Sequence, residues 1–267
     1  MLSRFLLKFL ILSRNKKHLK NHKPRLAVYS FDHIAAKIHI DGRFENLELK
    51  ALEELILERI DPKTVCLDIG ANIGNHSIAF SDHFLHVYAF EPNPEVFELL
   101  KINAKLKTNI TPWNVGLSSK RKKVEVVQNL KNVGSSGIGV YPSNYKGNTI
   151  VFKLRTLDNL LKKEETEPIS FIKIDVEGHE QQVILGALKT LVKHKPIVAL
   201  EIRRAESDGQ TTPSIEALKS ANYKYFYEIR VGSRMNWLGA KARLTPIKHI
   251  AKKNYPMLIA SQNRLNY

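Results

Sequence analysis

Two acidic residues flank a glycine-containing turn between residues 65 and 94. The run VCLDIGANIGNHSIAF begins with an apolar stretch, turns at Gly70 and Gly74, and continues with helical spacing. Asp68 precedes the first glycine, and Glu91 lies 21 residues after Gly70, at the end of the next apolar stretch. This order of strand, turn, helix, strand and acid is typical of a nucleotide site. In such a site Glu91 would accept hydrogen bonds from the two ribose hydroxyls.

The missing glycines and the charge of Asp68 decide which nucleotide fits. A dinucleotide-binding loop has the pattern G-x-G-x-x-G, but Asn72 and Asn75 stand where the second and third glycines belong. The negative charge of Asp68 opposes a pyrophosphate and suits the sulfonium and ammonium of S-adenosylmethionine. No G-x-x-x-x-G-K-[ST] phosphate loop occurs. The segment therefore predicts an S-adenosylmethionine site, with an ordinary tight turn as the alternative.

Short apolar runs alternate with stretches of helical spacing around this site. We expect helices at Leu47–Ile60 and Pro94–Lys105. We expect strands at Val65–Ile69, Val87–Phe90, around Val115, and at Phe171–Ile174, Ile197–Ile202, Tyr223–Ile229 and Met257–Ala260. The last two are expected to pair antiparallel at a sheet edge. This alternation predicts an α/β fold with a doubly wound, mostly parallel sheet covered by helices on both faces.

The chain before residue 61 is predicted to form two extensions. Residues 1–24 are a basic amphipathic segment, and residues 25–60 are a strand and helix extension that starts with a β-hairpin. Asp32 and the pair Asp41-Gly42 are the expected turns of that hairpin. The main domain is then expected to span residues 61–267.

Half of the net charge of +16 lies in the first 25 residues, which hold eight Lys or Arg and no acid. The segment MLSRFLLKFLILSR is too short to span a bilayer. On a helix it has an apolar arc of Leu2, Phe5, Leu6, Phe9, Leu10 and Leu12, typical of a helix on an anionic membrane surface. A helix docked on the domain is the alternative. The lone Cys66 excludes disulfide and cysteine-zinc frameworks and favours the cytoplasm.

A series of motifs gives the chain a family resemblance. CLDIGANIGNHS and YAFEPNPEVFELLKIN are followed by NVGLSS (114–119), GSSG (134–137), RTLDNL (155–160), FIKIDVEGHEQQVILGA (171–187) and PIVALEI (196–202). From Val65 to Ile202 the sequence resembles the FkbM family of S-adenosylmethionine-dependent O-methyltransferases. The resemblance implies a class I, Rossmann-like methyltransferase fold for residues 61–267.

The resemblance also implies roles for single residues. It places Asp68, Gly70, Asn72 and Gly74 around the methionine part of S-adenosylmethionine, Glu91 at the ribose, and Asn114 with Val115 at the adenine edge. It places Asp175 at the end of the fourth strand, close to the transferable methyl group. The family pattern gives no support to a role for His179.

Methyl transfer to a hydroxyl needs alignment and a group that takes the hydroxyl proton. Asp175 and His179 are the two candidates for this catalytic base, because Gly178 lets the chain turn between them, and histidine has the more suitable pKa. In the alternative, Glu177 and Glu180 only favour a helix dipole and His179 is an exposed helix-start residue. No metal site is expected, because neighbours around one turn seldom converge on one ion.

Four further residues have both a functional and a structural interpretation. His76 either faces the site or caps the helix after the glycine loop, and Trp113 either stacks on adenine or packs in the core. Arg203 and Arg204 follow a strand at the end expected to bind ligands. They either bind an acidic or phosphate-bearing acceptor or are solvated.

The sequence thus predicts a cytoplasmic O-methyltransferase that acts on a hydroxyl of a sugar, glycan or lipid-linked saccharide. Peripheral contact with an anionic membrane would run through residues 1–25. RNA methylation is an alternative suggested by net charge, but the acidic turn Asp175-Val176-Glu177-Gly178 replaces the Asn/Asp-Pro-Pro-aromatic element of base-amine methylation, so nucleic acid is not the expected partner. A non-catalytic nucleic-acid or membrane-binding protein on a methyltransferase scaffold is the other alternative.

Overall fold

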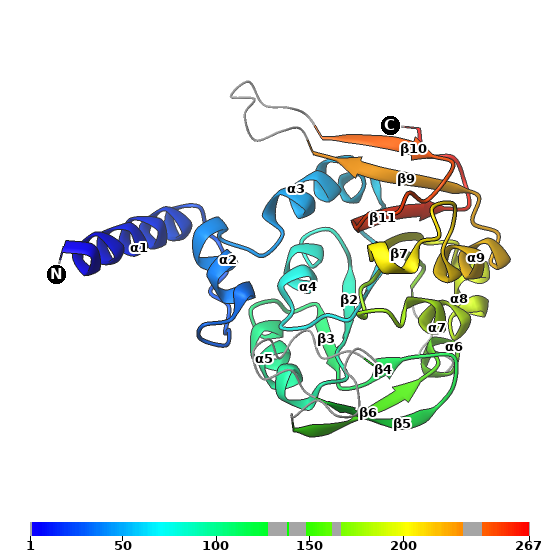
Figure 1. Ribbon diagram of the computed structural model, residues 1–267, viewed down its shortest axis with the longest axis horizontal. Helices are drawn as coiled ribbons and strands as arrows, with labels where there is room; N and C mark the ends of the chain where they lie inside the picture. The colour runs from blue at the N-terminus through cyan, green and yellow to red at the C-terminus, as the bar shows by residue number, and fades with distance from the viewer. Residues whose placement is uncertain (1, 128–137, 139–147, 162–166, 232–241, 267) are drawn as a thin grey trace.

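The computed structural model describes residues 2–127, 138, 148–161, 167–231 and 242–266 (Figure 1). The GSSG stretch at 134–137 lies outside the described residues. In the described part of the chain, one large sheet and one small sheet are flanked by helices. An N-terminal helix, α1 (Leu2–Lys20), projects away from them.

The large sheet has a parallel half and an antiparallel half. Its parallel strands follow the order β3 (Ile110–Trp113), β2 (His86–Phe90), β1 (Val65–Ile69), β7 (Ile169–Ile174) and β8 (Ile197–Ile202). Beyond β8 lie the antiparallel strands β11 (Tyr255–Ser261), β9 (Tyr225–Arg230) and β10 (Arg243–Ile247). The bounds of β1 and β8 match the predicted strands, and β9 pairs with β11 antiparallel as predicted. The outermost strand, however, is the unpredicted β10, so β9 and β11 lie inside the sheet.

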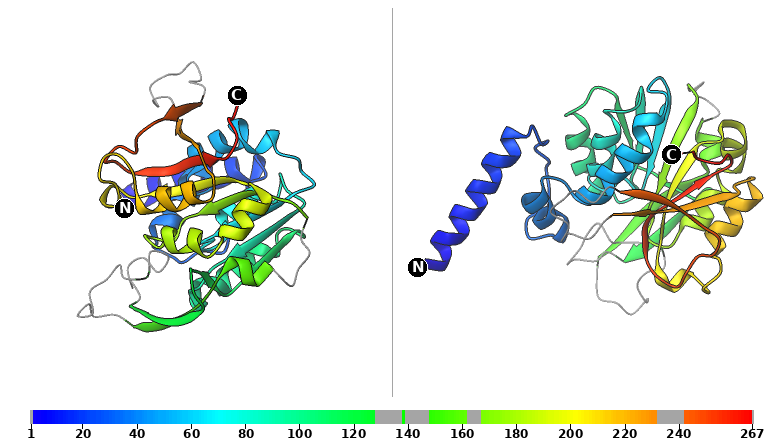
Figure 2. Two further views of the ribbon diagram at one scale, coloured as in Figure 1. Left: turned by 90° about the vertical axis from the view of Figure 1, so that its right-hand side faces the viewer. Right: turned by 90° about the horizontal axis from the view of Figure 1, so that it is seen from above.

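Helices cover both faces of this sheet, which confirms the doubly wound α/β fold (Figure 2). Side chains alternate along β1, so that Val65 and Leu67 enter one core cluster and Cys66 the other. The cluster of Val65 also takes in side chains of α6 (Leu157–Leu160), α7 (Glu180–Leu185), α8 (Leu188–His194) and α9 (Pro213–Ser220). The cluster of Cys66 takes in α3 (Asn46–Leu55), the short 3₁₀ turn at Leu57–Arg59, α4 (Asn75–Phe80) and α5 (Pro94–Ala104).

A second, three-stranded sheet lies beside the carboxyl ends of the parallel strands. It has the order β4 (Gly116–Leu117), β6 (Thr149–Arg155) and β5 (Lys122–Val127), and its core is formed by Val126, Phe152 and Leu154. Val115, the centre of a predicted strand, lies between β3 and β4, where its amide donates to the carbonyl oxygen of Trp113 at 2.9 Å. The chain therefore leaves the large sheet at Trp113 and enters the small sheet at Gly116.

The predicted β-hairpin after residue 24 is wrong, because residues 25–45 contain the helix α2 (His33–Asp41) and no strand. The two expected turn sites are the caps of this helix. Asp32 accepts a hydrogen bond from the amide of Ile34 at 3.2 Å, and Gly42 ends the helix in the left-handed conformation at φ 84°. Capping and hairpin turns use the same residue types, so the local pattern did not separate them.

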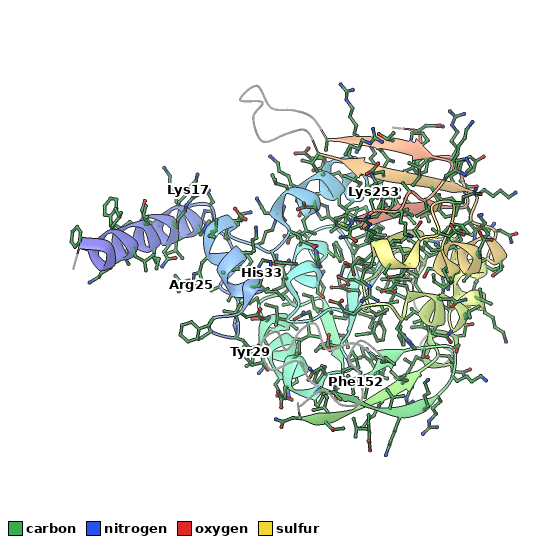
Figure 3. The ribbon with its side chains drawn as sticks, viewed as in Figure 1. Lys17, Arg25, Tyr29, His33, Phe152 and Lys253 are labelled. Carbon is green, nitrogen blue, oxygen red and sulfur yellow. The ribbon has the colours of Figure 1, made fainter. Side chains whose placement is uncertain are left out.

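From Phe5 onward, helix α1 exposes its apolar side chains (Figure 3). Phe5 is 72% exposed and Phe9 62% exposed, and Leu6, Leu7, Leu10, Ile11 and Leu12 are exposed as well. Its C-terminal end is held to α2 by a 3.0 Å hydrogen bond between the His18 ring and the carbonyl oxygen of His39. The structure thus does not show the alternative of a helix docked on the sheets.

Within the described residues, no helix combines the length and the hydropathy needed to cross a bilayer.

Candidate functional site

A buried ammonium group joins the carboxyl ends of β1 and β7. Lys173 is the direct neighbour of Asp68 in the parallel register, and only 3% of Lys173 is exposed. Its Nζ lies 3.0 Å from Oδ2 of Asp175 and 3.8 Å from Oδ1 of Asp68. Burial alone lowers the pKa of Lys173, but attraction to Asp175 and Asp68 outweighs burial and raises it above the ordinary value. The ammonium therefore stays charged between two carboxylates.

Asp175 also shares a hydrogen bond with Glu201, just beyond the paired ends of β7 and β8. Ile174 pairs with Leu200 in the parallel register, so the next residue of each strand lies beside the other. Burial and the charge of Asp175 raise the pKa of Glu201 well above its ordinary value. Burial opposes ionisation of Asp175 too, but Lys173 and the hydrogen bond from Glu201 lower its pKa. At neutral pH Glu201 is therefore protonated, and its hydroxyl donates a hydrogen bond to the carboxylate of Asp175.

The glycine loop is held against the ends of β2 and β7. The amides of Gly70 and Ala71 both donate to the carbonyl oxygen of Phe90 at 3.0 Å. Gly70 has a positive φ of 81°, and a Cβ there would lie 1.7 Å from the carbonyl oxygen of Asp175. Only glycine therefore permits this close approach of β1 to the chain that carries Asp175.

Glu91 closes the other side of the loop. Its Oε2 accepts from the amide of Asn72 at 3.0 Å, and its Oε1 accepts from the amide of Asn93 at 2.8 Å. Burial raises the pKa of Glu91 to about 7, although both backbone hydrogen bonds oppose that shift. The carboxyl group consequently changes its charge near neutral pH.

These groups border a cavity of about 200 Å³ at the carboxyl ends of the parallel strands. Gly70, Asn72, Glu91, Asp175 and His179, all predicted site residues, line it together. The small sheet contributes Leu117, Phe152 and Leu154 to the wall, and α2 contributes His33 and Ile34 (Figure 3 labels His33 and Phe152). The cavity thus combines an acidic end with apolar walls, as a site for a nucleoside with a charged substituent would.

The N-terminal extension completes one wall of the cavity. Phe44 and Asn75 exchange two hydrogen bonds: the Phe44 amide donates to Asn75 Oδ1 at 3.0 Å, and Asn75 Nδ2 donates to the Phe44 carbonyl at 3.1 Å. Nε2 of His76 lies 3.1 Å from Oε2 of Glu45. His76 thus lines the cavity, in agreement with its interpretation as a residue that faces the site. Its contact with Glu45 also helps to fix the extension to α4.

Four predicted donor-binding residues do not line the cavity. Asp68 is fully buried behind Lys173 and accepts from the hydroxyl of Ser77 at 2.5 Å. Gly74 faces Leu100 of α5, where a Cβ on residue 74 would lie only 2.8 Å from the leucine methyl. Its lack of a side chain therefore serves helix packing.

Asn114 and Val115 also stand apart from the cavity wall. The side chain of Asn114 braces the loop after β2 by donating to the carbonyl of Glu91 at 3.0 Å, and Val115 is buried in the core. Their neighbours Gly116 and Leu117 line the cavity instead. Trp113 packs against Phe90, with ring centroids 6.3 Å apart, in agreement with its interpretation as a core aromatic residue.

His179 stands at the start of α7 and reaches the small sheet. Its Nε2 lies 2.9 Å from the hydroxyl of Ser118. Burial and, to a smaller extent, the charge of Lys122 lower the pKa of His179. The imidazole is therefore neutral at pH 7 and has one ring nitrogen able to accept a proton.

Sequence reasoning missed Lys173 and Glu201 as site residues. A signal for both existed, since each is a charged residue within an otherwise apolar strand, in FIKI and VALEI. The sequence holds no comparable signal for the cavity residues Phe152, His33 and Phe44, because their place at the cavity depends on how distant segments pack.

Comparison with known proteins shows which family the sequence matches. The profile of the methyltransferase FkbM domain matches residues 68–225. Hexuronic acid methyltransferase AglP of Haloferax volcanii is 30% identical over 138 residues, which make up 51% of this chain and 55% of AglP. The chain thus matches about half the length of this curated relative.

Two solved structures are similar to parts of this chain. An FkbM methyltransferase from Methylobacillus flagellatus KT is 16% identical, with a TM-score of 0.48. The match covers 93% of this chain and 59% of the methyltransferase chain. Aeropyrum pernix fibrillarin, solved with S-adenosyl-L-methionine, is 12% identical, with a TM-score of 0.41. The match covers 80% of this chain and 74% of the fibrillarin chain.

The motifs that carry the resemblance from Val65 to Ile202 lie almost wholly within the matched residues, and that match extends over more than half of the chain, from β1 to the start of β9. The protein therefore belongs to the FkbM family of S-adenosylmethionine-dependent methyltransferases, with their α/β, class I fold.

Proposed function

We propose that this protein transfers the methyl group of S-adenosylmethionine to a hydroxyl of a sugar, glycan or lipid-linked saccharide. The observation that carries this proposal is that Asp175 and His179 line the same cavity as the glycine loop and Glu91. A saccharide acceptor is supported by the similarity to a protein named as a hexuronic acid methyltransferase.

The charges around the cavity suit a cationic methyl donor. Two carboxylates, Asp68 and Asp175, face the single ammonium of Lys173, while Glu201 keeps its proton. This set carries one net negative charge, which favours a positively charged ligand. Oδ1 of Asp68 also lacks a hydrogen-bond partner among the described residues. When bound, S-adenosylmethionine supplies a methyl group activated by its positively charged sulfur.

The glycine loop and Glu91 are the groups that we expect to hold the donor. Each carboxylate oxygen of Glu91 accepts one backbone amide and keeps capacity for a second hydrogen bond. Two ribose hydroxyls are the donors that match this pair of oxygens. The apolar side chains of Phe90, Leu117 and Phe152 offer the surface that an adenine ring requires.

Asp175 and His179 differ in what they can do for the acceptor. The ammonium of Lys173 and the proton of Glu201 stabilise the ionised form of Asp175, which makes it a weak base and a strong hydrogen-bond acceptor. We therefore assign Asp175 the orientation of the acceptor hydroxyl. His179 is neutral at pH 7, and we assign it the uptake of the hydroxyl proton.

Helix α1 suggests where the acceptor is met. Its exposed apolar side chains are joined by Lys8, Arg14, Lys16, Lys17 and Lys20, with no acid in the helix. Apolar burial in the headgroup region and attraction to anionic lipids both favour binding of such a helix to a membrane surface. We propose that α1 holds the enzyme at the cytoplasmic face of a membrane, close to lipid-linked saccharides.

The charge of Glu91 yields a test of donor binding. Because ribose hydroxyls bind the carboxylate better than the carboxylic acid, and its pKa is about 7, affinity for S-adenosylhomocysteine should fall as the pH falls through 7. We expect calorimetry to give about tenfold weaker binding at pH 6 than at pH 8. Glu91→Gln should bind more weakly at pH 8 and lose this pH dependence, whereas Glu98→Gln on the exposed face of α5 should keep it. A pH dependence that persists in Glu91→Gln would place the ribose elsewhere.

The acceptor is tested by incubating the protein with isotope-labelled S-adenosylmethionine and extracted glycans, glycolipids or RNA, followed by mass spectrometry. We expect the label in the saccharide fractions.

The roles of Asp175 and His179 are tested by substitution. At saturating donor, Asp175→Asn should lower the turnover by about 100-fold or more. His179→Gln should lower the turnover comparably, and at saturating donor the wild-type turnover should rise with pH through one ionisation that lies below the ordinary pKa of histidine. Label found only in RNA would refute the saccharide proposal, and a fully active His179→Gln would leave Asp175 as the source of rate.

The membrane proposal predicts a selective effect of truncation. Deleting residues 1–23 should leave calorimetric binding of S-adenosylhomocysteine intact and abolish sedimentation with vesicles that contain anionic lipids, each lost basic residue being worth about 1 kcal/mol. Replacing Phe5 and Phe9 by Ser should weaken the same association without any change of charge. Equal sedimentation of the full-length and truncated proteins would contradict a membrane role for α1.

A further inference from the structure

A second cavity opens beside the first. It has a volume of about 490 Å³, and its wall includes Arg203, Arg204 and Asn254. Glu45 and Glu201 line both cavities, so the two meet at these side chains. A ligand in the second cavity would therefore lie next to Asp175, which is hydrogen-bonded to Glu201.

Most charges in this second wall already have partners. Glu45 lies 3.1 Å from the ring of His76. Arg203 is held by Glu206, at 3.0 Å from its Nε, and lies 3.7 Å from Glu177. The pKa of Glu201 is raised by burial and by Asp175, so Glu201 is uncharged at neutral pH.

Arg204 is the exception in this wall. Its backbone amide is fixed by a 2.7 Å hydrogen bond to Oδ1 of Asn254, but its guanidinium forms no ion pair within the described part of the chain. Asn254 thus anchors the start of the 3₁₀ turn Arg204–Glu206 at the rim of the cavity. Arg204 is thus an exposed cation without a counter-charge among the described residues, in a wall that meets the first cavity at Glu45 and Glu201.

We propose that Arg204 binds a carboxylate or phosphate group of the acceptor, so that the enzyme selects anionic saccharides. This inference rests on the proposed function, since it places the charged group of the acceptor in the second cavity and its hydroxyl in the first. The planar guanidinium presents paired N–H donors that match the two oxygens of such a group. A neutral sugar offers no counter-charge to it.

The test is a binding measurement made without turnover. Methyl β-D-glucuronide, glucose 6-phosphate and the neutral methyl β-D-glucoside are titrated by calorimetry into the protein saturated with S-adenosylhomocysteine. We expect at least one of the two anionic sugars to bind ten or more times tighter than the glucoside, and the better of the two identifies the anionic group. Arg204→Gln should reduce this preference to near unity. Arg121→Gln, which removes the same charge from an exposed position before β5, should retain it.

The possible results distinguish a failure of the Arg204 assignment from a failure of the proposed function. A wild-type protein without a preference for either anion, or an Arg204→Gln variant that keeps the preference, would overturn the assignment. Methylation of saccharides with no dependence on Arg204 would also overturn it, while the proposed function would stand. Anion binding that depends on Arg204, in a protein that methylates no saccharide, would support the site and refute the function.

Discussion

The ion pairs of Lys173 are the interaction on which the rest of the site depends. The side chain is nearly fully buried, and it lies between carboxylates at the ends of β1 and β7. Removing two carboxylates from water without this ammonium would be strongly unfavourable. With it, Asp175 stays ionised at the cavity and Asp68 stays in place beneath it. Glu201 keeps its proton because burial and the charge of Asp175 raise its pKa, although the ammonium of Lys173 acts in the opposite direction.

The alternation of side chains along the strands explains why these groups meet. Cys66, Phe171 and Ala199 enter the core cluster beneath α3, α4 and α5. Side chains two residues further along each strand point to the same face, which places Asp68, Lys173 and Glu201 together. The apolar face thus becomes polar at its carboxyl end, where the parallel strands stop. Phe44 and Glu45 of the N-terminal extension cover this end, so the extension belongs to the site as much as the sheet does.

Local patterns in the sequence predicted the strands and the glycine loop. Contacts between distant segments could not be predicted from such patterns. Val65–Ile69 and Ile197–Ile202 are uninterrupted apolar runs, and Gly70 marks the turn after the first, so both strands and the loop followed from the residues. The place of Lys173 follows only from the pairing of β1 with β7. The N-terminal helix α2 was mistaken for a hairpin, since Asp32 and Gly42 suit caps and turns equally. Asn114 and Val115, predicted at the adenine edge, do not line the cavity, whereas Gly116 and Leu117 of the two-residue strand β4 do, and so short a strand leaves little pattern in the sequence.

The free energy of unfolding of Lys173→Met as a function of pH tests the central role of this ammonium most directly. We expect a loss of about 3 to 5 kcal/mol at pH 8, because the substitution leaves buried carboxylates without a counter-charge. Because Lys173 lowers the pKa of Asp175, its loss would raise the folded-state pKa of Asp175, so the variant should recover stability as the pH is lowered towards 5 and this carboxylate takes up a proton. Lys224→Met, at an exposed position, should follow the wild type at every pH. A Lys173→Met protein that loses less than about 1 kcal/mol and has the pH profile of the wild type would contradict the account.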